Sequence, residues 1–284
     1  MLRRFTAKRA RACLQDVGPI IFLGDSVTRY QFLTLYYFIL TGKYQHAFDG
    51  TKSLSNAHRH ALEDAVAGGD YRYDRLWEHV QKLVHEFEPT GSLSLVHNRS
   101  ASQEEAHFVL PGAEAGKKVE LLYNYIADGG PEVVGRAVDW VRGRGVKPAY
   151  ILLNVCAHYH GRRPSTDISK DVLGTLRWWS TSARRKLPDT QLVWKSCTTP
   201  FAQYREGVDE EEVKIVKAAK NARVAVYDIR DIALQSWRQH IIATLAPTSV
   251  HFYQFWYENF NDMLLNVLCP AAPEDYPEAG GKQA

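Results

Sequence analysis

The chain has 284 residues, 45% of them hydrophobic, with four cysteines and a formal net charge of +3. This is enough apolar sequence for a large buried core, which excludes a chain that is disordered throughout. The basic and acidic residues are nearly balanced and scattered, so no nucleic-acid-binding surface is predicted.

The N-terminal segment, MLRRFTAKRAR, is strongly basic. No apolar run of signal-peptide length follows it, and the most apolar later stretch, residues 32–40, is too short to span a bilayer. We therefore predict a basic arm over residues 1–17 of a soluble chain. A targeting segment or a truncated membrane-proximal stem is the alternative.

Five short runs rich in Val, Ile, Leu and Tyr predict buried strands at residues 19–23, 119–125, 149–155, 191–195 and 223–227. Helical patterns alternate with them at residues 27–40, 131–142, 169–186 and 210–220. This order predicts one α/β domain over residues 18–269, with a mainly parallel five-stranded sheet and helices on both faces.

Residues 42–118 form a segment that is too long for an ordinary crossover, and we interpret it as an insertion. It carries helical patterns at residues 56–66 and 73–87. Residues 89–114 are rich in Ser, Gly and polar side chains, which predicts a loop that forms one wall of a cleft. The tail, residues 270–284, is rich in Pro, Gly and charge and is predicted to be disordered.

The four cysteines are Cys13, Cys156, Cys197 and Cys269. Their wide spacing argues against a structural zinc site. Cys156 and Cys197 lie at predicted strand ends, where we expect buried thiols rather than bridges. Neither the His158 and His160 pair nor any acidic cluster completes a usual ligand set, so no metal or cofactor is predicted.

Ser26 lies where the first predicted strand gives way to the first helix, in the stretch FLGDSVTR. Ligands of open α/β sheets bind outside the carboxyl ends of the strands. The amide groups and dipole of a helix N-terminus favour an oxyanion beside the serine, and Gly24 allows a close backbone approach. Asp and Ser are also ordinary helix caps, so this stretch alone predicts either a nucleophile or a cap.

A serine nucleophile needs a base that takes its proton. His251 is the candidate, because it precedes a long amphipathic helix and is expected on a loop after the last strand. His158 and His160 follow the third predicted strand and are expected at its carboxyl end.

Four blocks of the chain, in order, resemble the SGNH-hydrolase superfamily of GDSL-like enzymes. FLGDSVTRYQFLTL is similar to its first block, and the GDSxxR form at residues 24–29 resembles the PC-esterase and trichome-birefringence-like branch. ILLNVCAHYH resembles the Asn-x-Gly-x-His block of that branch, with Asn154 and His158 in register. LVWKSCTTP and VHFYQFWYENFNDMLLNVLC are similar to its late strand and its C-terminal His-bearing block.

The resemblance implies a flavodoxin-like three-layer α/β/α fold that forms an acyl-enzyme on serine. Ser26 would be the nucleophile and His251 the general base. Asn154 and the backbone amide of Ser26 would hold the oxyanion. Arg29 would brace the site or bind an acidic group, and is otherwise an exposed surface arginine. The oxyanion and binding region would also include Gly24, Asp25 and His158. The implied partners are an acyl donor and an acetylated or acetyl-accepting glycan.

Two departures from the family pattern concern the catalytic blocks. Thr248 stands where the family has the acid of its Asp-x-x-His block, and Cys156 stands where it has glycine. A histidine without its orienting carboxylate can lose about 10⁴ in rate. Three arrangements remain: a Ser-His dyad oriented by a backbone carbonyl, an acid recruited from elsewhere, or an inactive fold that retains a binding cleft. The nearest acids are Asp228 and Asp231, which are also typical turn and cap residues.

The leading hypothesis is therefore a serine-dependent O-acetyltransferase or esterase that acts on a glycan. The alternative is a catalytically impaired glycan- or partner-binding protein, because of Thr248. A lipid esterase is a third reading, since the fold alone does not select the acyl group. The resemblance implies the Golgi lumen or the secretory pathway, although the chain carries no evident signal peptide or anchor.

Overall fold

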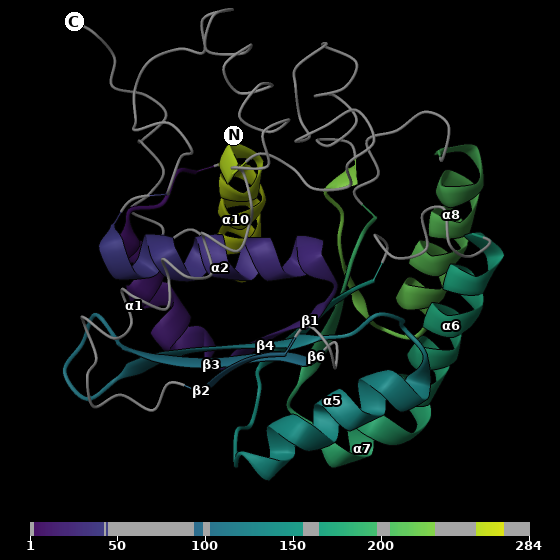
Figure 1. The fold of residues 1–284 in the computed structure, drawn as a ribbon, viewed down its shortest axis with the longest axis horizontal. Coiled ribbons are helices and arrows are strands. Elements are labelled where there is room, and N and C mark those ends of the chain that lie inside the picture. Colours follow the sequence, from purple (N-terminus) through teal and green to yellow (C-terminus); the bar gives the residue numbers. More distant parts are fainter. Residues whose placement is uncertain are drawn as a thin grey trace, which may run out of the picture.

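The fold centres on one β-sheet, drawn in Figure 1. The computed structural model describes residues 3–42, 44, 94–98, 103–155, 165–197, 205–230 and 254–269. Within these residues the sheet has seven strands, in the order β2-β3-β4-β1-β5-β6-β7. Strand β1 is central, with β4 on one side and β5 on the other.

Five neighbouring strands of this sheet run parallel, and each corresponds to one of the five predicted runs. They are β4 (Lys118–Tyr125), β1 (Ile20–Gly24), β5 (Tyr150–Asn154), β6 (Gln191–Lys195) and β7 (Ala225–Tyr227). The prediction of an α/β domain with a mainly parallel sheet is therefore confirmed.

The prediction of only five strands, and of a loop at residues 89–114, is wrong. That segment contains β2 (Ser94–Asn98) and β3 (Gln103–Pro111), which extend the sheet antiparallel beyond β4. In β3 buried residues alternate with partly exposed ones, which is the pattern of a half-covered strand. The inward-facing apolar residues are Ala106, Phe108 and Leu110.

Helices cover both faces of the sheet (Figure 1). On one face lie α1 (Ala7–Val17), α2 (Ser26–Thr41) and α10 (Gln254–Leu268). On the other lie α5 (Pro131–Gly143), α6 (Ser165–Trp178) and α8 (Arg205–Asn221). The predicted helix at residues 169–186 is interrupted, because α6 passes through a π-helical turn, η3 (Trp179–Ala183), into the short α7 (Arg184–Lys186).

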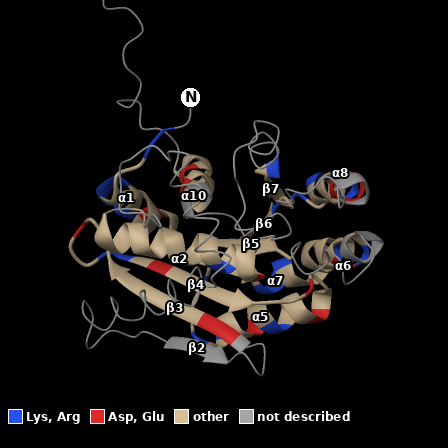
Figure 2. Cartoon of the chain, turned by 45° about the horizontal axis from the view of Figure 1, so that its top comes forward, with Lys and Arg blue, Asp and Glu red and all other residues tan. Residues whose placement is uncertain are grey.

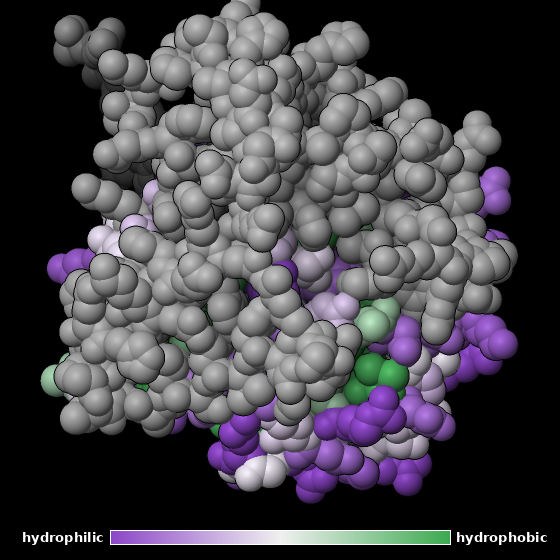
Figure 3. Space-filling model, in the orientation of Figure 1, coloured by the Kyte–Doolittle hydropathy of each residue, from purple (hydrophilic) through white to green (hydrophobic). Residues whose placement is uncertain are grey.

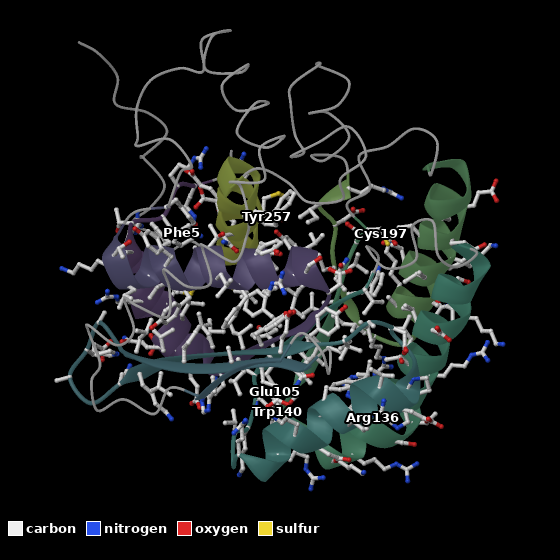
Figure 4. All side chains as sticks on the ribbon, viewed as in Figure 1. Phe5, Glu105, Arg136, Trp140, Cys197 and Tyr257 are labelled. Carbon is white, nitrogen blue, oxygen red and sulfur yellow. A yellow bond between two sulfur atoms is a disulfide. The ribbon has the colours of Figure 1, made fainter. Side chains whose placement is uncertain are left out.

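The two faces have separate hydrophobic cores, because successive side chains of a strand point to opposite sides. In β1, Phe22 packs into the core beneath α2 and α10, whereas Leu23 packs into the core beneath α5, α6 and α8. The sheet is tied to α5 by Trp140, whose indole N–H donates to Glu105 of β3 over 2.6 Å (Figure 4). The face carrying α2 is the one that bears the candidate site.

The segment expected as a basic arm contains a packed helix, α1, in which Ala10 and Leu14 are buried. A disulfide joins Cys13 of α1 to Cys269 after α10, with the Cα atoms 5.8 Å apart. Arg4 adds ion pairs to Glu258 and Asp262 of α10, of 2.9 and 2.6 Å. The N-terminal segment is thus fastened to the C-terminal helix.

The described surface carries charges of both signs. Figure 2 shows basic and acidic residues interspersed on α8, and Figure 3 shows a largely hydrophilic exterior around α5 and α7. No helix among the described residues has the length and apolarity needed to cross a bilayer. The helical patterns at residues 56–66 and 73–87 and the tail at 270–284 lie outside the described residues.

Candidate functional site

The described part of the candidate site lies at the carboxyl ends of three adjacent strands, β1, β5 and β6. Gly24 at the end of β1 is in register with Asn154 at the end of β5. Lys195 ends β6, the next strand along. Ser26 begins α2 only two residues beyond Gly24, so it lies at the same edge as Asn154.

Asp25 caps the helix that Ser26 begins. Its carboxylate accepts hydrogen bonds from the backbone N–H groups of Val27 and Thr28, at 3.0 and 3.5 Å. The Asp25 side chain is fully buried, whereas Ser26 is partly exposed. The cap therefore holds the first turn of α2 from the inside and leaves the serine on the accessible side.

Gly24 is required by a close backbone approach. A Cβ atom at this position would lie 2.2 Å from the carbonyl oxygen of Asn154 and 2.5 Å from Oγ1 of Thr28. The hydroxyl of buried Tyr123 donates to the carbonyl oxygens of Gly24 and Asp25, at 3.2 and 3.4 Å. These contacts hold the strand-to-helix turn closely against β4 and β5.

The Asn154 side chain is buried and faces β6. Its amide nitrogen lies 2.9 Å from the carbonyl oxygen of Lys195 and 3.2 Å from that of Ser196, and it donates to both. The amide thus fastens the ends of β5 and β6 together. Its predicted role as an oxyanion donor stays a prediction, because in this arrangement the amide is directed at the backbone of β6.

Arg29 is not an exposed surface arginine. One guanidinium nitrogen bonds both carboxylate oxygens of Glu104 on β3, and the other donates to the hydroxyl of Tyr30. The side chains of Arg29 and Glu104 are only 13% and 10% exposed. Burial lowers the pKa of the guanidinium, but its neighbours Tyr30, Tyr123 and Glu104 outweigh that effect, so its pKa lies above the ordinary value.

This ion pair connects α2, one turn beyond Ser26, to strand β3. The bracing role that was one of the two expectations for Arg29 is therefore the one its contacts fit. The next residue of α2, Tyr30, meets the ring of Tyr257 of α10 edge-on, with ring centroids 5.9 Å apart. The helix that begins with Ser26 is thus held from two directions.

Lys195 is the unexpected residue at this edge. Its side chain has no exposed surface, and its Nζ has no hydrogen-bond partner within the described part of the chain. Burial lowers its pKa to about 8, while the negative charge of Asp25 acts in the opposite direction. The sequence LVWKS indicates only a strand ending in a charged residue, which would ordinarily be solvent-exposed.

Several predicted residues lie outside the described residues: His251, His158, Thr248, Cys156 and Asp231. Asp228 is described, and its carboxylate accepts from the backbone N–H of Arg230 at 3.1 Å and pairs with the Arg230 guanidinium at 3.7 Å. Its contacts are those of a turn residue, the ordinary role that the sequence also allowed.

The expectation that Cys197 is a buried thiol is wrong. Cys197 follows β6 and is disulfide-bonded, and it is nearly fully buried. With the Cys13–Cys269 bridge, three of the four cysteines are shown to be oxidised. Wide spacing along the chain gives no sign of such pairing, because the partners meet only in the folded state.

Sequence reasoning missed three polar residues that support the edge, namely Tyr123, Glu104 and Lys195. Tyr123 lies in an apolar strand pattern, which predicts burial but not contact with the turn, and Lys195 ends a strand, where a lysine is ordinarily exposed. Glu104 lies in β3, in the segment where the sequence predicts a loop. Within the described ranges no group of three or more His, Cys, Asp or Glu side chains is arranged to hold a metal ion.

A cleft of about 600 Å³ lies at the other edge of the sheet, near the amino ends of β1, β5 and β6. Its lining includes Pro19, Ala149 and Thr190 together with exposed Lys147 and Lys186. This cleft is at the opposite end of the strands from Ser26, so it contributes nothing to the chemistry considered for the serine.

No protein-family model matches the chain, and no curated protein matches it.

Proposed function

We propose that this chain is an SGNH-type serine acyltransferase or esterase, of the PC-esterase and trichome-birefringence-like branch, that acts on O-acetyl groups of a glycan. The observation that carries the proposal is the position of Ser26. It is the first residue of α2, it lies two residues beyond the end of the central parallel strand, and it is at the same sheet edge as Asn154. Together with the four resembling sequence blocks, this is the position that a nucleophile of such an enzyme would occupy.

In the proposed reaction, Oγ of Ser26 attacks the carbonyl carbon of an acetyl ester while His251 takes the hydroxyl proton. The tetrahedral oxyanion is stabilised by the backbone N–H of Ser26 at the helix N-terminus and by the Asn154 amide, once that amide turns from the carbonyls it now contacts. A donor of this kind is typically worth roughly 3 to 4 kcal/mol of barrier. Collapse expels the alcohol, which takes its proton from His251, and leaves an acetyl ester on Ser26.

The second half of the reaction decides between transferase and esterase. A sugar hydroxyl or a water molecule loses its proton to His251 and attacks the acetyl group on Ser26, and Ser26 recovers its proton when it leaves. Both outcomes share the same acyl-enzyme, so the identity of the acceptor is all that separates them.

Thr248 stands where the resembling family has the acid that orients its histidine, so a different group orients His251 in the proposed enzyme. The Asp228 carboxylate is already bonded by Arg230. This favours either a backbone carbonyl or another acid as the orienting group.

The disulfides support an oxidising compartment for the proposed activity. Bridges such as Cys13–Cys269 persist in the secretory pathway and outside the cell and are rare in the cytosol. We propose that the chain acts where such bridges form, which is also where the glycans implied by the resemblance are modified.

The direct experiment is hydrolysis of an aryl acetate by the purified protein and by Ser26→Ala. A matched control is Ser182→Ala, an exposed serine of η3 remote from the sheet edge. The proposal expects turnover by the wild type and by the Ser182 variant, and none by the Ser26 variant. An acetylated donor with a glycan acceptor then distinguishes transfer from hydrolysis. Glycan binding without turnover, unchanged in Ser26→Ala, would instead identify the non-catalytic alternative suggested by Thr248.

A further inference from the structure

A buried lysine is the most unusual group near the Ser26 turn. Lys195 has no exposed surface, yet its Nζ finds no hydrogen-bond acceptor among the described residues. Nζ lies 6.0 Å from the centroid of the aromatic ring of Phe260 on α10. Because an ammonium group is costly to remove from water, a position like this is expected to have an electrostatic counterpart.

The counterpart is Asp25. Its carboxylate is fully buried one residue beyond Gly24, which is in register with Asn154, and the Asn154 amide in turn bonds the Lys195 carbonyl. The negative charge of Asp25 opposes the lowering of the Lys195 pKa by burial. Among the described residues Nζ of Lys195 makes no hydrogen bond to this carboxylate, and the two charges interact through space in a medium that screens poorly. A positive charge near a buried carboxyl group favours the ionised form of that group.

The charge of Asp25 matters for the shape of the turn. The carboxylate holds the N–H groups of Val27 and Thr28, and an ionised carboxylate is a stronger acceptor than a neutral one. If Asp25 took up a proton, these bonds would weaken and the first turn of α2, which begins with Ser26, would loosen.

Lys195 also contacts the site through its backbone. Its carbonyl oxygen accepts a hydrogen bond from the Asn154 amide at 2.9 Å. The end of β6 is therefore connected to the end of β5 through this hydrogen bond. It is connected to the turn between β1 and Ser26 through the charge of Lys195.

We infer that Lys195 is a positioning residue, whose buried positive charge keeps Asp25 ionised and thereby fixes the turn that presents Ser26. The coupling between Lys195 and Asp25 stands independently of any reaction. Its consequence for acyl transfer rests on the function proposed above. The experiment therefore measures the two separately.

The first measurement is a double-mutant cycle in denaturant unfolding, with Lys195→Met, Asp25→Asn and the double variant. Methionine keeps most of the side-chain volume, and asparagine keeps the cap. We expect strong non-additivity, with the Asp25→Asn effect on the unfolding equilibrium constant changing at least about fivefold when Lys195 is replaced. If Lys195→Met alone does not fold, the double variant, which removes both charges, should recover folding. Additive effects, or a double variant no better than the lysine variant, would overturn the inference.

The second measurement is the rate at which a fluorophosphonate probe labels Ser26, corrected for the folded fraction. Lys195→Met and Lys195→Gln should both slow labelling by about tenfold or more, since small misplacements of reacting groups are costly. Val193→Ala, on the same strand and the same face, is the control, because it should reduce stability and leave the labelling rate unchanged.

The outcomes separate the two claims. Labelling of Lys195→Met at the wild-type rate would refute the positioning role and leave the proposed function intact. A wild type that does not react would refute the proposed function, and the unfolding cycle would then decide the inference alone.

Discussion

Replacing Gly24 with alanine tests the close packing at the sheet edge. The added methyl group would lie 2.2 Å from the carbonyl oxygen of Asn154 and 2.5 Å from Oγ1 of Thr28. Ordinary contacts of a Cβ atom begin near 3.4 Å, so the backbones of β1 and β5 would have to separate by more than an ångström. The obstacle is a backbone atom of a paired strand, which cannot rotate away.

The expected cost follows from this geometry. Overpacking in a well-packed core typically costs 1 to 3 kcal/mol and occasionally more. Because a backbone contact is involved, we expect a loss near the top of this range, about 3 kcal/mol, partly offset by less than about 1 kcal/mol from the stiffer unfolded chain. For a chain of this size the net loss corresponds to a fall in Tm of roughly 4 °C or more.

The assay is thermal and denaturant unfolding of Gly24→Ala, with Gly143→Ala as the control. Gly143 ends α5, and a Cβ there would meet nothing within 4 Å. The control should therefore be unchanged or up to about 1 kcal/mol more stable. Labelling of Ser26 should also slow in Gly24→Ala, because the turn is displaced. A Gly24→Ala protein as stable as the wild type would refute the close approach of β1 and β5 described above.

Three further outcomes are expected. Replacing both Cys13 and Cys269 with alanine should cost about 2 to 5 kcal/mol in unfolding free energy, because the bridge closes a separation of 256 residues; an unchanged denaturation midpoint would contradict this. Removing either Arg29 or Glu104 should cost about 3 kcal/mol, and the double variant should lose less than the sum. Burial raises the pKa of Glu212 from 4.5 to about 7, so the folded state binds its proton more tightly and stability falls as pH rises through that window. The Glu212→Gln variant should lack this decline, so its unfolding free energy relative to that of the wild type should rise by up to about 3 kcal/mol between pH 4 and pH 8. Urea titrations at several pH values measure this difference. Parallel pH curves of stability for the two proteins would contradict the prediction.

The parallel part of the sheet could be predicted because each of its strands is a short apolar run. A run such as residues 20–24 is buried on both faces, and such runs stand out in any sequence. Strand β3 escaped prediction because only one of its faces is apolar. Its first residues, Gln103, Glu104 and Glu105, read as a polar loop, although the alternation that follows them is the signal of a half-buried strand.

Contacts between residues that lie far apart in the sequence could not be predicted. Nothing in the sequence connects Arg29 with Glu104, or Cys13 with Cys269, because these pairs form only when helices and strands from distant segments pack together. The basic residues near the N-terminus suggested a free arm for the same reason. The acidic groups of α10 that Arg4 meets lie more than 250 residues away.

The candidate site was predictable only where local chain geometry determines it. A strand followed by Gly24, Asp25 and Ser26 predicts a tight turn and a helix cap, and the described contacts have that form. The inward direction of Lys195 was not predictable, since a lysine at a strand end is ordinarily exposed. The ring of Phe260 on α10, which packs on the face of the sheet that carries α2, lies 6.0 Å from its Nζ.

The central claim is that an activated serine at position 26 depends on a histidine at position 251. The most direct measurement is peptide mapping after reaction with a fluorophosphonate probe, which bonds to activated serines and releases fluoride. The account predicts one adduct, on the peptide that contains Ser26, formed by the wild type and slowed by at least about 10³-fold in a folded His251→Ala variant. An unlabelled wild type, or equal labelling of the two proteins, would contradict it.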